Sequence, residues 1–191
     1  MAARDNLGDM DTQDLKTRRH FLATTGICLA IPSGVYALDS QVKFKAKTLD
    51  GETFSTDSVH GKIVLVQFWA TWCPYCKSDA SALDAVAREF QDQGLLVLAV
   101  DVAESKKTVT KYLAESPREC KIVLMTDTNL AAWFSPKSFP YYAAIDRTGN
   151  LVGEQKGAGG ERSLRHLLGK AGLRSDETDD PGELRSSPRR S

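Results

Sequence analysis

The sequence predicts an α/β fold in which a mixed central sheet carries helices on both faces and follows an N-terminal β-hairpin. Three observations predict it. An alternating apolar and polar segment with a turn comes first, strand and helix patterns then follow in a βαβαβ order, and two strands and a helix close the domain. With 191 residues, of which 41% are hydrophobic, the chain can bury one ordinary core.

The first half of the domain supplies the hairpin, one central strand and a helix. Residues Val42 to Lys47 alternate in polarity, Asp50-Gly51 forms a turn, and residues 53–55 return as the second strand. The apolar run from Ile63 to Trp69 is typical of a buried strand. We expect one helix over residues 73–91, because its apolar residues recur at helical spacing.

The second half continues the alternation of strands and helices. The almost wholly apolar run from Leu95 to Val100 predicts another buried strand. The remaining expected elements are a helix over 106–114, a short strand over 122–125, a helical turn over 129–134, hairpin strands over 141–145 and 151–155, and a closing helix over 161–171.

Cys73 and Cys76 lie two residues apart at the predicted turn from strand to helix. This position places the first sulfur at a helix N-terminus, where free N–H groups and the helix dipole stabilise a thiolate. Pro74 suits the first helical turn because it has no N–H to leave unpaired. We therefore expect Cys73 to be the nucleophile and Cys76 to be the more buried resolving thiol of a two-electron cycle that needs no cofactor.

Other uses of such a cysteine pair are less consistent with the sequence. Attachment of a c-type haem needs a histidine after the second cysteine, and residue 77 is lysine. A structural zinc site needs two further ligands, and outside the leader only Cys120, His60 and His166 remain. A structural disulfide would close too short a loop to stabilise the fold strongly. We expect no metal, and we expect Cys120 to be a small buried hydrophobe rather than a regulatory thiol.

Residues 1–37 resemble a twin-arginine export signal. Arg18-Arg19 precedes a moderately apolar stretch over 23–31, and small residues precede Ala37 at a cleavage position. The apolar stretch is shorter than the ~20 residues that span a membrane. We therefore expect cleavage after Ala37 and no stable membrane span in the mature form. The alternatives are an uncleaved anchor and lipid attachment at Cys28.

The rest of the chain divides into one domain and a tail. Residues 38–174 carry all the predicted elements, whereas residues 175–191 contain almost nothing that can be buried and are expected to be disordered. The 25 basic and 25 acidic residues balance, so the charge gives no reason to expect binding to nucleic acid. An exported protein that keeps one close cysteine pair is suited to redox chemistry.

The motifs together resemble the thioredoxin superfamily and, more narrowly, the exported TlpA/ResA-type thiol-disulfide oxidoreductases. The resemblance covers residues 42 to about 172. It rests on the segment Val66 to Lys77, on the Asp50-Gly51 hairpin before residues 61–64, and on Phe139-Pro140 before residues 144–149. It implies a thioredoxin-like fold in which Pro140 is cis and lies against the cysteine pair, while the backbone before Pro140 binds substrate.

The sequence departs from this family at three places. Gln67 occupies the position of a buried aspartate in thioredoxins, and an amide cannot act as a general base for Cys76. The helix proline expected shortly after the pair is absent, with Ala80 and Ser81 in that region. The dipeptide Pro74-Tyr75 differs from those common in reducing members and is closer to glutaredoxins and stronger oxidants.

The resulting prediction is a periplasmic thiol-disulfide oxidoreductase that reduces protein disulfides and is recharged by a membrane electron donor. The residues expected to face the substrate are Trp72, Pro74, Tyr75, Phe139 and Pro140. The first alternative is an oxidant that donates disulfides to periplasmic proteins. The others are a copper-handling module, which would use the two thiols as soft ligands, and a thiol peroxidase, for which Thr71 lies one residue too close to Cys73.

Overall fold

Strand β3 (Ile63–Trp69) lies in the interior of a seven-stranded sheet, with four strands on one side and two on the other, and all of its residues are buried. The computed structural model describes residues 41–174. The strand order is β2-β1-β5-β4-β3-β6-β7; β3, β4 and β5 are parallel, and β1, β6 and β7 run antiparallel to their neighbours. The mixed sheet and the thioredoxin-like fold expected from the sequence are confirmed.

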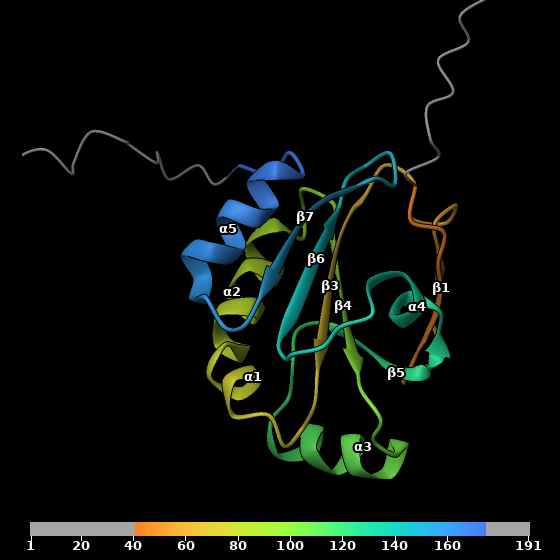
Figure 1. Cartoon of the computed structure of the whole chain (residues 1–191), viewed down its shortest axis with the longest axis vertical. Helices are drawn as coiled ribbons and strands as arrows, with labels where there is room; N and C mark the ends of the chain where they lie inside the picture. Colours follow the sequence, from red (N-terminus) through yellow and green to blue (C-terminus); the bar gives the residue numbers. More distant parts are fainter. Residues whose placement is uncertain (1–40, 175–191) are drawn as a thin grey trace, which may run out of the picture. The chain divides into compact units, whose positions relative to one another are not determined.

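The other strands are β1 (Lys45–Thr48), β2 (Thr53–Ser55), β4 (Leu95–Asp101), β5 (Lys121–Thr128), β6 (Tyr141–Ile145) and β7 (Leu151–Lys156). The helices are α1 (Pro74–Ser78), α2 (Ala80–Phe90), α3 (Lys106–Glu115), α4 (Leu130–Phe134) and α5 (Gly160–Lys170). Helices α1, α2 and α5 cover one face of the sheet, α4 lies on the other face, and α3 lies beyond the carboxyl end of β4 (Figure 1).

The local sequence explains how most elements begin and end. In the opening hairpin, Gly51 has φ of +94°, a conformation that suits glycine, and its N–H donates to the Thr48 carbonyl. Helix α3 begins where the Ser105 hydroxyl accepts from the Thr108 N–H. Helix α5 packs on α2 through an apolar stripe that includes Leu164, Leu167 and Leu168.

Two expectations about the elements need correction. The single helix predicted over 73–91 is divided at Asp79, whose backbone still has helix-like angles but belongs to neither α1 nor α2. The Asp79 side chain points away from solvent and binds groups on other elements. Strand β5 extends to Thr128, beyond the predicted 122–125, because β1 pairs with it between Ala46 and Thr128.

The expected export signal, residues 1–37, and the expected tail, residues 175–191, lie outside the described residues. Within residues 41–174, no helix is both long enough and apolar enough to cross a membrane.

Candidate active site

Cys73 and Cys76 form a disulfide at the junction of β3 and α1, with their Cα atoms 5.3 Å apart. Cys73 is the N-cap of α1, and its sulfur accepts a hydrogen bond from the Cys76 N–H over 3.2 Å. A sulfur that accepts this N–H is stabilised as a thiolate once the disulfide is reduced. Both cysteines are buried, with 3% of Cys73 and 1% of Cys76 exposed, so the expected difference in burial is small.

Two aromatic side chains stand exposed around the disulfide. Trp72 is 63% exposed and Tyr75 is 68% exposed, although large aromatic residues are usually buried. The Trp72 ring packs edge to face on Phe139, with 6.3 Å between ring centroids. The peptide bond between Phe139 and Pro140 is cis, as the family resemblance implies.

An apolar groove of about 460 Å³ opens beside these aromatic residues. Its walls come from the Cys73 turn, the end of β4, strand β5 and the segment before β6. The lining residues are Trp72, Val102, Ala103, Met125, Ala131, Ser135, Pro136 and Phe139. An open apolar groove next to a disulfide can receive the apolar side chains of a protein substrate.

A buried chain of hydrogen bonds connects β3 and β6 to the helical segment after Cys76. Gln67 Nε2 donates to the Tyr142 hydroxyl over 2.9 Å, and that hydroxyl donates to Asp79 Oδ2 over 2.6 Å. The second oxygen of Asp79 accepts from the Gly160 N–H over 2.8 Å. Burial, followed by the hydrogen bond and charge of Asp79, raises the pKa of Tyr142 far above its usual range. Tyr142 therefore stays protonated and acts as a donor.

Asp79 brings a carboxyl group to the helical segment that carries Cys76. It follows Cys76 by three residues, which places both side chains on one side of the helical segment, and only 2% of Asp79 is exposed. Gln67, at the position of the thioredoxin aspartate, is fully buried, and its Oε1 has no partner within the described residues. The acidic group missing from β3 is thus present on the other side of Tyr142.

Thr71, two residues before Cys73, is hydrogen-bonded to Glu104, which lies shortly after the end of β4. Its N–H and its hydroxyl both donate to the Glu104 carboxylate, each over 2.6 Å. A peroxidase would need the hydroxyl of a nearby threonine at its reactive cysteine, and the Thr71 hydroxyl is engaged with Glu104 instead.

Cys120 takes no part in this site. It is 9% exposed and precedes β5, and burial raises the pKa of its thiol to about 11. The expected burial of Cys120 is confirmed, and a thiol whose pKa is raised in this way is mostly protonated at neutral pH.

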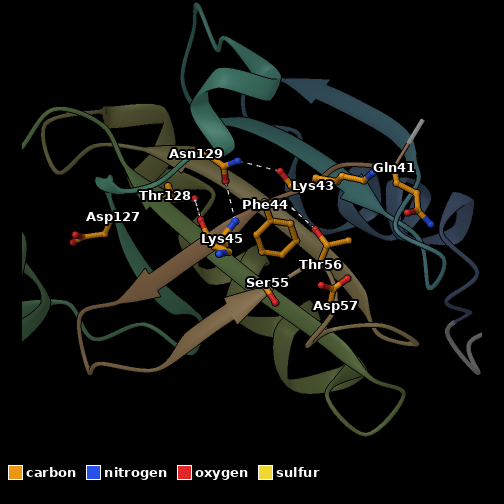
Figure 2. A pocket seen from close by; sticks show the side chains of 10 residues that line it. All are labelled: Gln41, Lys43, Phe44, Lys45, Ser55, Thr56, Asp57, Asp127, Thr128 and Asn129. Atoms are coloured by element: carbon orange, nitrogen blue, oxygen red, sulfur yellow. Dashed lines mark hydrogen bonds between the residues drawn. The ribbon is translucent and has the colours of Figure 1, made fainter. Parts of the chain in front are cut away.

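A larger pocket, of about 660 Å³, lies away from the disulfide between β1, β2 and the start of α4 (Figure 2). None of the residues that line it belongs to the cysteine pair or its groove. Its polar groups bind one another: Asn129 Oδ1 accepts from the Lys45 N–H over 2.9 Å, and Asn129 Nδ2 donates to the Lys43 carbonyl over 3.0 Å (Figure 2). These hydrogen bonds connect the residue that precedes α4 to β1 of the opening hairpin and to the segment before it.

Sequence reasoning placed the cysteines, the aromatic residues and Pro140 in one region, and the contact between the Trp72 and Phe139 rings brings the residue before Pro140 to the turn that carries Cys73. It missed Asp79, Tyr142 and Glu104. Asp79 carried a usable signal, because it is an acidic residue one helical turn after Cys76. Tyr142 lies opposite Gln67 in the register of β3 and β6, which the sequence does not reveal.

A protein-family model described as the AhpC/TSA family matches residues 38–156. The thiol-disulfide oxidoreductase ResA of Bacillus subtilis is 26% identical over 153 residues, which cover 72% of this chain and 86% of ResA. Thioredoxin-like protein YneN of the same organism is 32% identical over 108 residues, covering 56% of this chain and 63% of YneN.

Solved structures show the same fold. A putative thiol:disulfide interchange protein DsbE from Chlorobium tepidum superposes with a TM-score of 0.62 at 21% identity, covering 70% of this chain and 95% of that protein. The MTB protein dsbF, solved in mixed oxidized and reduced forms, gives a TM-score of 0.59 at 28% identity, covering 69% of this chain and 97% of dsbF.

Proposed function

The chain belongs to the AhpC/TSA family and is a thioredoxin-like thiol-disulfide oxidoreductase, and from this premise we propose that it is exported and reduces disulfides of periplasmic proteins. The observation that supports the proposal most directly is the Cys73–Cys76 disulfide at the edge of an apolar groove. Such a groove suits an extended protein segment better than a small polar oxidant.

The proposed cycle uses the two cysteines in the order that their positions suggest. The Cys73 thiolate attacks a substrate disulfide, one sulfur of that disulfide leaves as a thiol, and a mixed disulfide forms. Cys76 then loses its proton and attacks the Cys73 sulfur, which closes the Cys73–Cys76 disulfide and releases the second substrate thiol. A membrane electron donor would return two electrons and restore the dithiol.

Substrate binding is assigned to the surface around the disulfide. The exposed rings of Trp72 and Tyr75 and the groove wall at Phe139 would contact apolar side chains of the substrate. Pro74 is exposed beside them in the first turn of α1. The backbone next to the cis bond at Pro140 would pair with the substrate backbone.

Asp79 is proposed as the group that handles the proton of Cys76. It is buried, it lies one helical turn after Cys76, and its oxygens accept hydrogen bonds from Tyr142 and Gly160. Gln67 cannot remove a proton, so the carboxyl group of Asp79 takes the role that the sequence left to water or another group.

The place of action is proposed from the sequence of the leader. Residues 1–37 would direct export by a twin-arginine route and be removed, which leaves the domain of residues 38–174 and the tail of residues 175–191 in the periplasm. Export is tested by fusing residues 1–45 to a reporter that is active only after twin-arginine export. The matched control replaces Arg18 and Arg19 with lysine, and equal export of both fusions would contradict this route.

The direction of electron transfer is tested by the reduction potential of the Cys73/Cys76 pair. The full chain is equilibrated in thiol redox buffers, and its two states are separated by the mass of an alkylating label. A potential of around −250 mV or lower is expected for a reductant that needs an electron donor. A potential of about −120 mV would overturn the proposed direction of electron transfer and indicate a disulfide donor.

The substrate class is tested by trapping. A Cys76→Ser variant cannot resolve the mixed disulfide, so it should accumulate covalent complexes with substrate proteins in the exporting organism. A Cys73→Ser variant is the matched control and should trap none. Complexes absent from both variants would argue against protein disulfides as substrates.

A further inference from the structure

Two acidic residues meet at the carboxyl end of β4, next to the turn that carries Cys73. Asp101 is the last residue of β4 and is fully buried, and Glu104 follows it by three residues. Ala103, between them, has φ of +64°, a left-handed conformation that is uncommon for a residue with a Cβ atom. This conformation folds the chain back, so that the Glu104 N–H donates to Asp101 Oδ1 over 3.2 Å.

Glu104 connects this acidic pair to the active site. Its carboxylate accepts both the N–H and the hydroxyl of Thr71 at 2.6 Å. Thr71 is the second residue of a tight turn in which the Cys73 N–H donates to the Ala70 carbonyl over 3.1 Å. Glu104 therefore fixes the middle of the turn that ends at the nucleophilic sulfur.

The two carboxyl groups differ in their ionisation. Burial, reinforced by hydrogen bonding and the charge of Glu104, raises the pKa of Asp101 to about 7. Burial acts against ionisation of Glu104 too, but the hydrogen bonds from Thr71, the hydrogen bond with Asp101 and the charge of Lys77 outweigh it, and the pKa of Glu104 lies below its ordinary value. Just below neutral pH, Asp101 is mostly protonated and Glu104 is ionised.

We propose that Glu104 is a positioning residue for Cys73 and that Asp101 makes its hold on Thr71 depend on pH. When Asp101 is protonated, Glu104 is the only charged member of the pair and holds Thr71 by two bonds. When Asp101 loses its proton, two neighbouring carboxylates, one of them fully buried, repel each other and the hydrogen bonds to Thr71 weaken. The inference rests on the proposed thiol chemistry of Cys73, but the contact itself can be measured without that chemistry.

Cationic side chains of α1, α3 and the segment before β5 also lie around the pair and Thr71. Lys77 of α1 acts on Glu104, and the Arg118 guanidinium lies 5.6 Å from the ring centroid of Trp69, which pairs with Asp101 across β3 and β4. Lys107 and Lys111 of α3 line an open hollow of about 350 Å³ together with Thr71. Lysine and arginine ordinarily stay charged between about pH 5 and pH 9. A change near neutral pH therefore points to Asp101.

The first test measures hydrogen exchange of the Thr71 N–H in the oxidised full chain by NMR. The protection factor should fall by about tenfold between pH 6 and pH 8 in the wild type, because the hydrogen bond to Glu104 opens more often. Asp101→Asn, which mimics the protonated form, should keep the protection constant. Asp57→Asn makes the same chemical change at an exposed carboxyl after β2 and should behave as the wild type.

Constant protection of Thr71 in the wild type from pH 6 to pH 8 would overturn the proposal, and this result needs no variant to fold. The same slope in Asp101→Asn and in the wild type would also overturn it. Because the oxidised protein is used, failure here is distinct from failure of the proposed reductase activity, which the potential and the trapping experiment decide.

The second test links the contact to reactivity. The rate of alkylation of Cys73 by iodoacetamide is measured from pH 5 to pH 9 in the reduced full chain, with the labelled site identified by mass. The wild type should show an ionisation near pH 7 besides that of the thiol, and Asp101→Asn should lack it. Glu104→Gln should move this ionisation to lower pH, since it removes the charge that helps to hold the proton on Asp101. Superimposable profiles of all three proteins would refute the coupling.

Discussion

The Tyr142 hydroxyl donates a 2.6 Å hydrogen bond to Asp79 Oδ2, and this contact joins the strand after Pro140 to the helical segment after Cys76. The two residues are 63 positions apart in the sequence, yet both are almost completely buried. The contact fixes the Asp79 side chain, to which we assign the proton of Cys76. The strand that follows Pro140 and the helical segment that carries Cys76 are therefore joined by one buried hydrogen bond.

Removal of the Tyr142 hydroxyl should destabilise the fold. Tyr142→Phe deprives Asp79 and Gln67 of a buried partner, and the free energy of unfolding should fall by about 1 to 3 kcal/mol, measured by urea denaturation. Tyr141→Phe is the control, because the Tyr141 hydroxyl binds the exposed side chain of Glu154. If the free energy of unfolding fell equally in both variants, the buried contact would stabilise the fold no more than the exposed one.

Replacement of Asp79 should slow resolution more than attack. With a reduced protein and a chromogenic aromatic disulfide, Cys73 releases the first aromatic thiol and Cys76 releases the second. Asp79→Asn should slow the second release by at least about tenfold and flatten its pH dependence, because a general base has been removed. Asp92→Asn, at an exposed carboxyl after α2, should leave both phases unchanged. A second phase of normal rate and pH profile in Asp79→Asn would refute the assignment.

The stability of the fold should decrease as the pH rises through the acidic range, because of Asp101. Its pKa is about 7 in the folded chain, against an ordinary value of 3.8, so between these values the folded state holds a proton that the unfolded state has lost. The contribution of Asp101 to the free energy of unfolding is therefore largest below pH 4 and is lost as the pH approaches 7. Asp101→Asn should gain about 1 kcal/mol or more over the wild type between pH 4.5 and pH 8 in urea denaturation. A constant difference between the two proteins would contradict the shift.

Trp72 should matter for protein substrates and not for small thiols. Trp72→Ser removes the exposed ring at the groove edge, and kcat/KM for reduction of insulin disulfides should fall by about tenfold, as expected for an aromatic anchor of an interface. Exchange with dithiothreitol should be unaffected, since the small thiol does not use the groove. Leu151→Ser, at an exposed apolar residue on β7, is the control. Equal losses with insulin and dithiothreitol would place the effect on the disulfide itself.

The part of the site that is local in sequence could be predicted from the sequence. Cys73, Cys76 and Trp72 lie within one turn, and the strand before them has an unbroken apolar pattern. The break in the helix at Asp79 was missed because the apolar spacing of α2 looks the same with or without it. In the fold, the helical segment is divided at Asp79, whose side chain accepts hydrogen bonds from Tyr142 and Gly160. Both of these residues are far away in sequence.

The contacts that cross between strands could not be predicted. Gln67 meets Tyr142 through the register of β3 with β6, over 75 residues, and Thr71 meets Glu104 over 33 residues. The register of β3 with β6 depends on how the whole sheet packs, so it could not be deduced from the pattern of a single sequence. The left-handed conformation of Ala103, which turns Glu104 back toward Thr71, is likewise atypical of its residue type.

The interior position of β3 in the sheet determines which segments of this protein can change in length over evolution and which cannot. Two strands lie on one side of β3 and four on the other, so the disulfide is attached to an interior strand of the sheet and not to an edge strand. The Asp50-Gly51 turn joins β1 and β2 at the outer edge and is exposed. Insertions or altered lengths at that turn should be tolerated across a lineage, while a register shift of one residue in β3 would move Thr71 away from Glu104 and Trp72 away from Phe139.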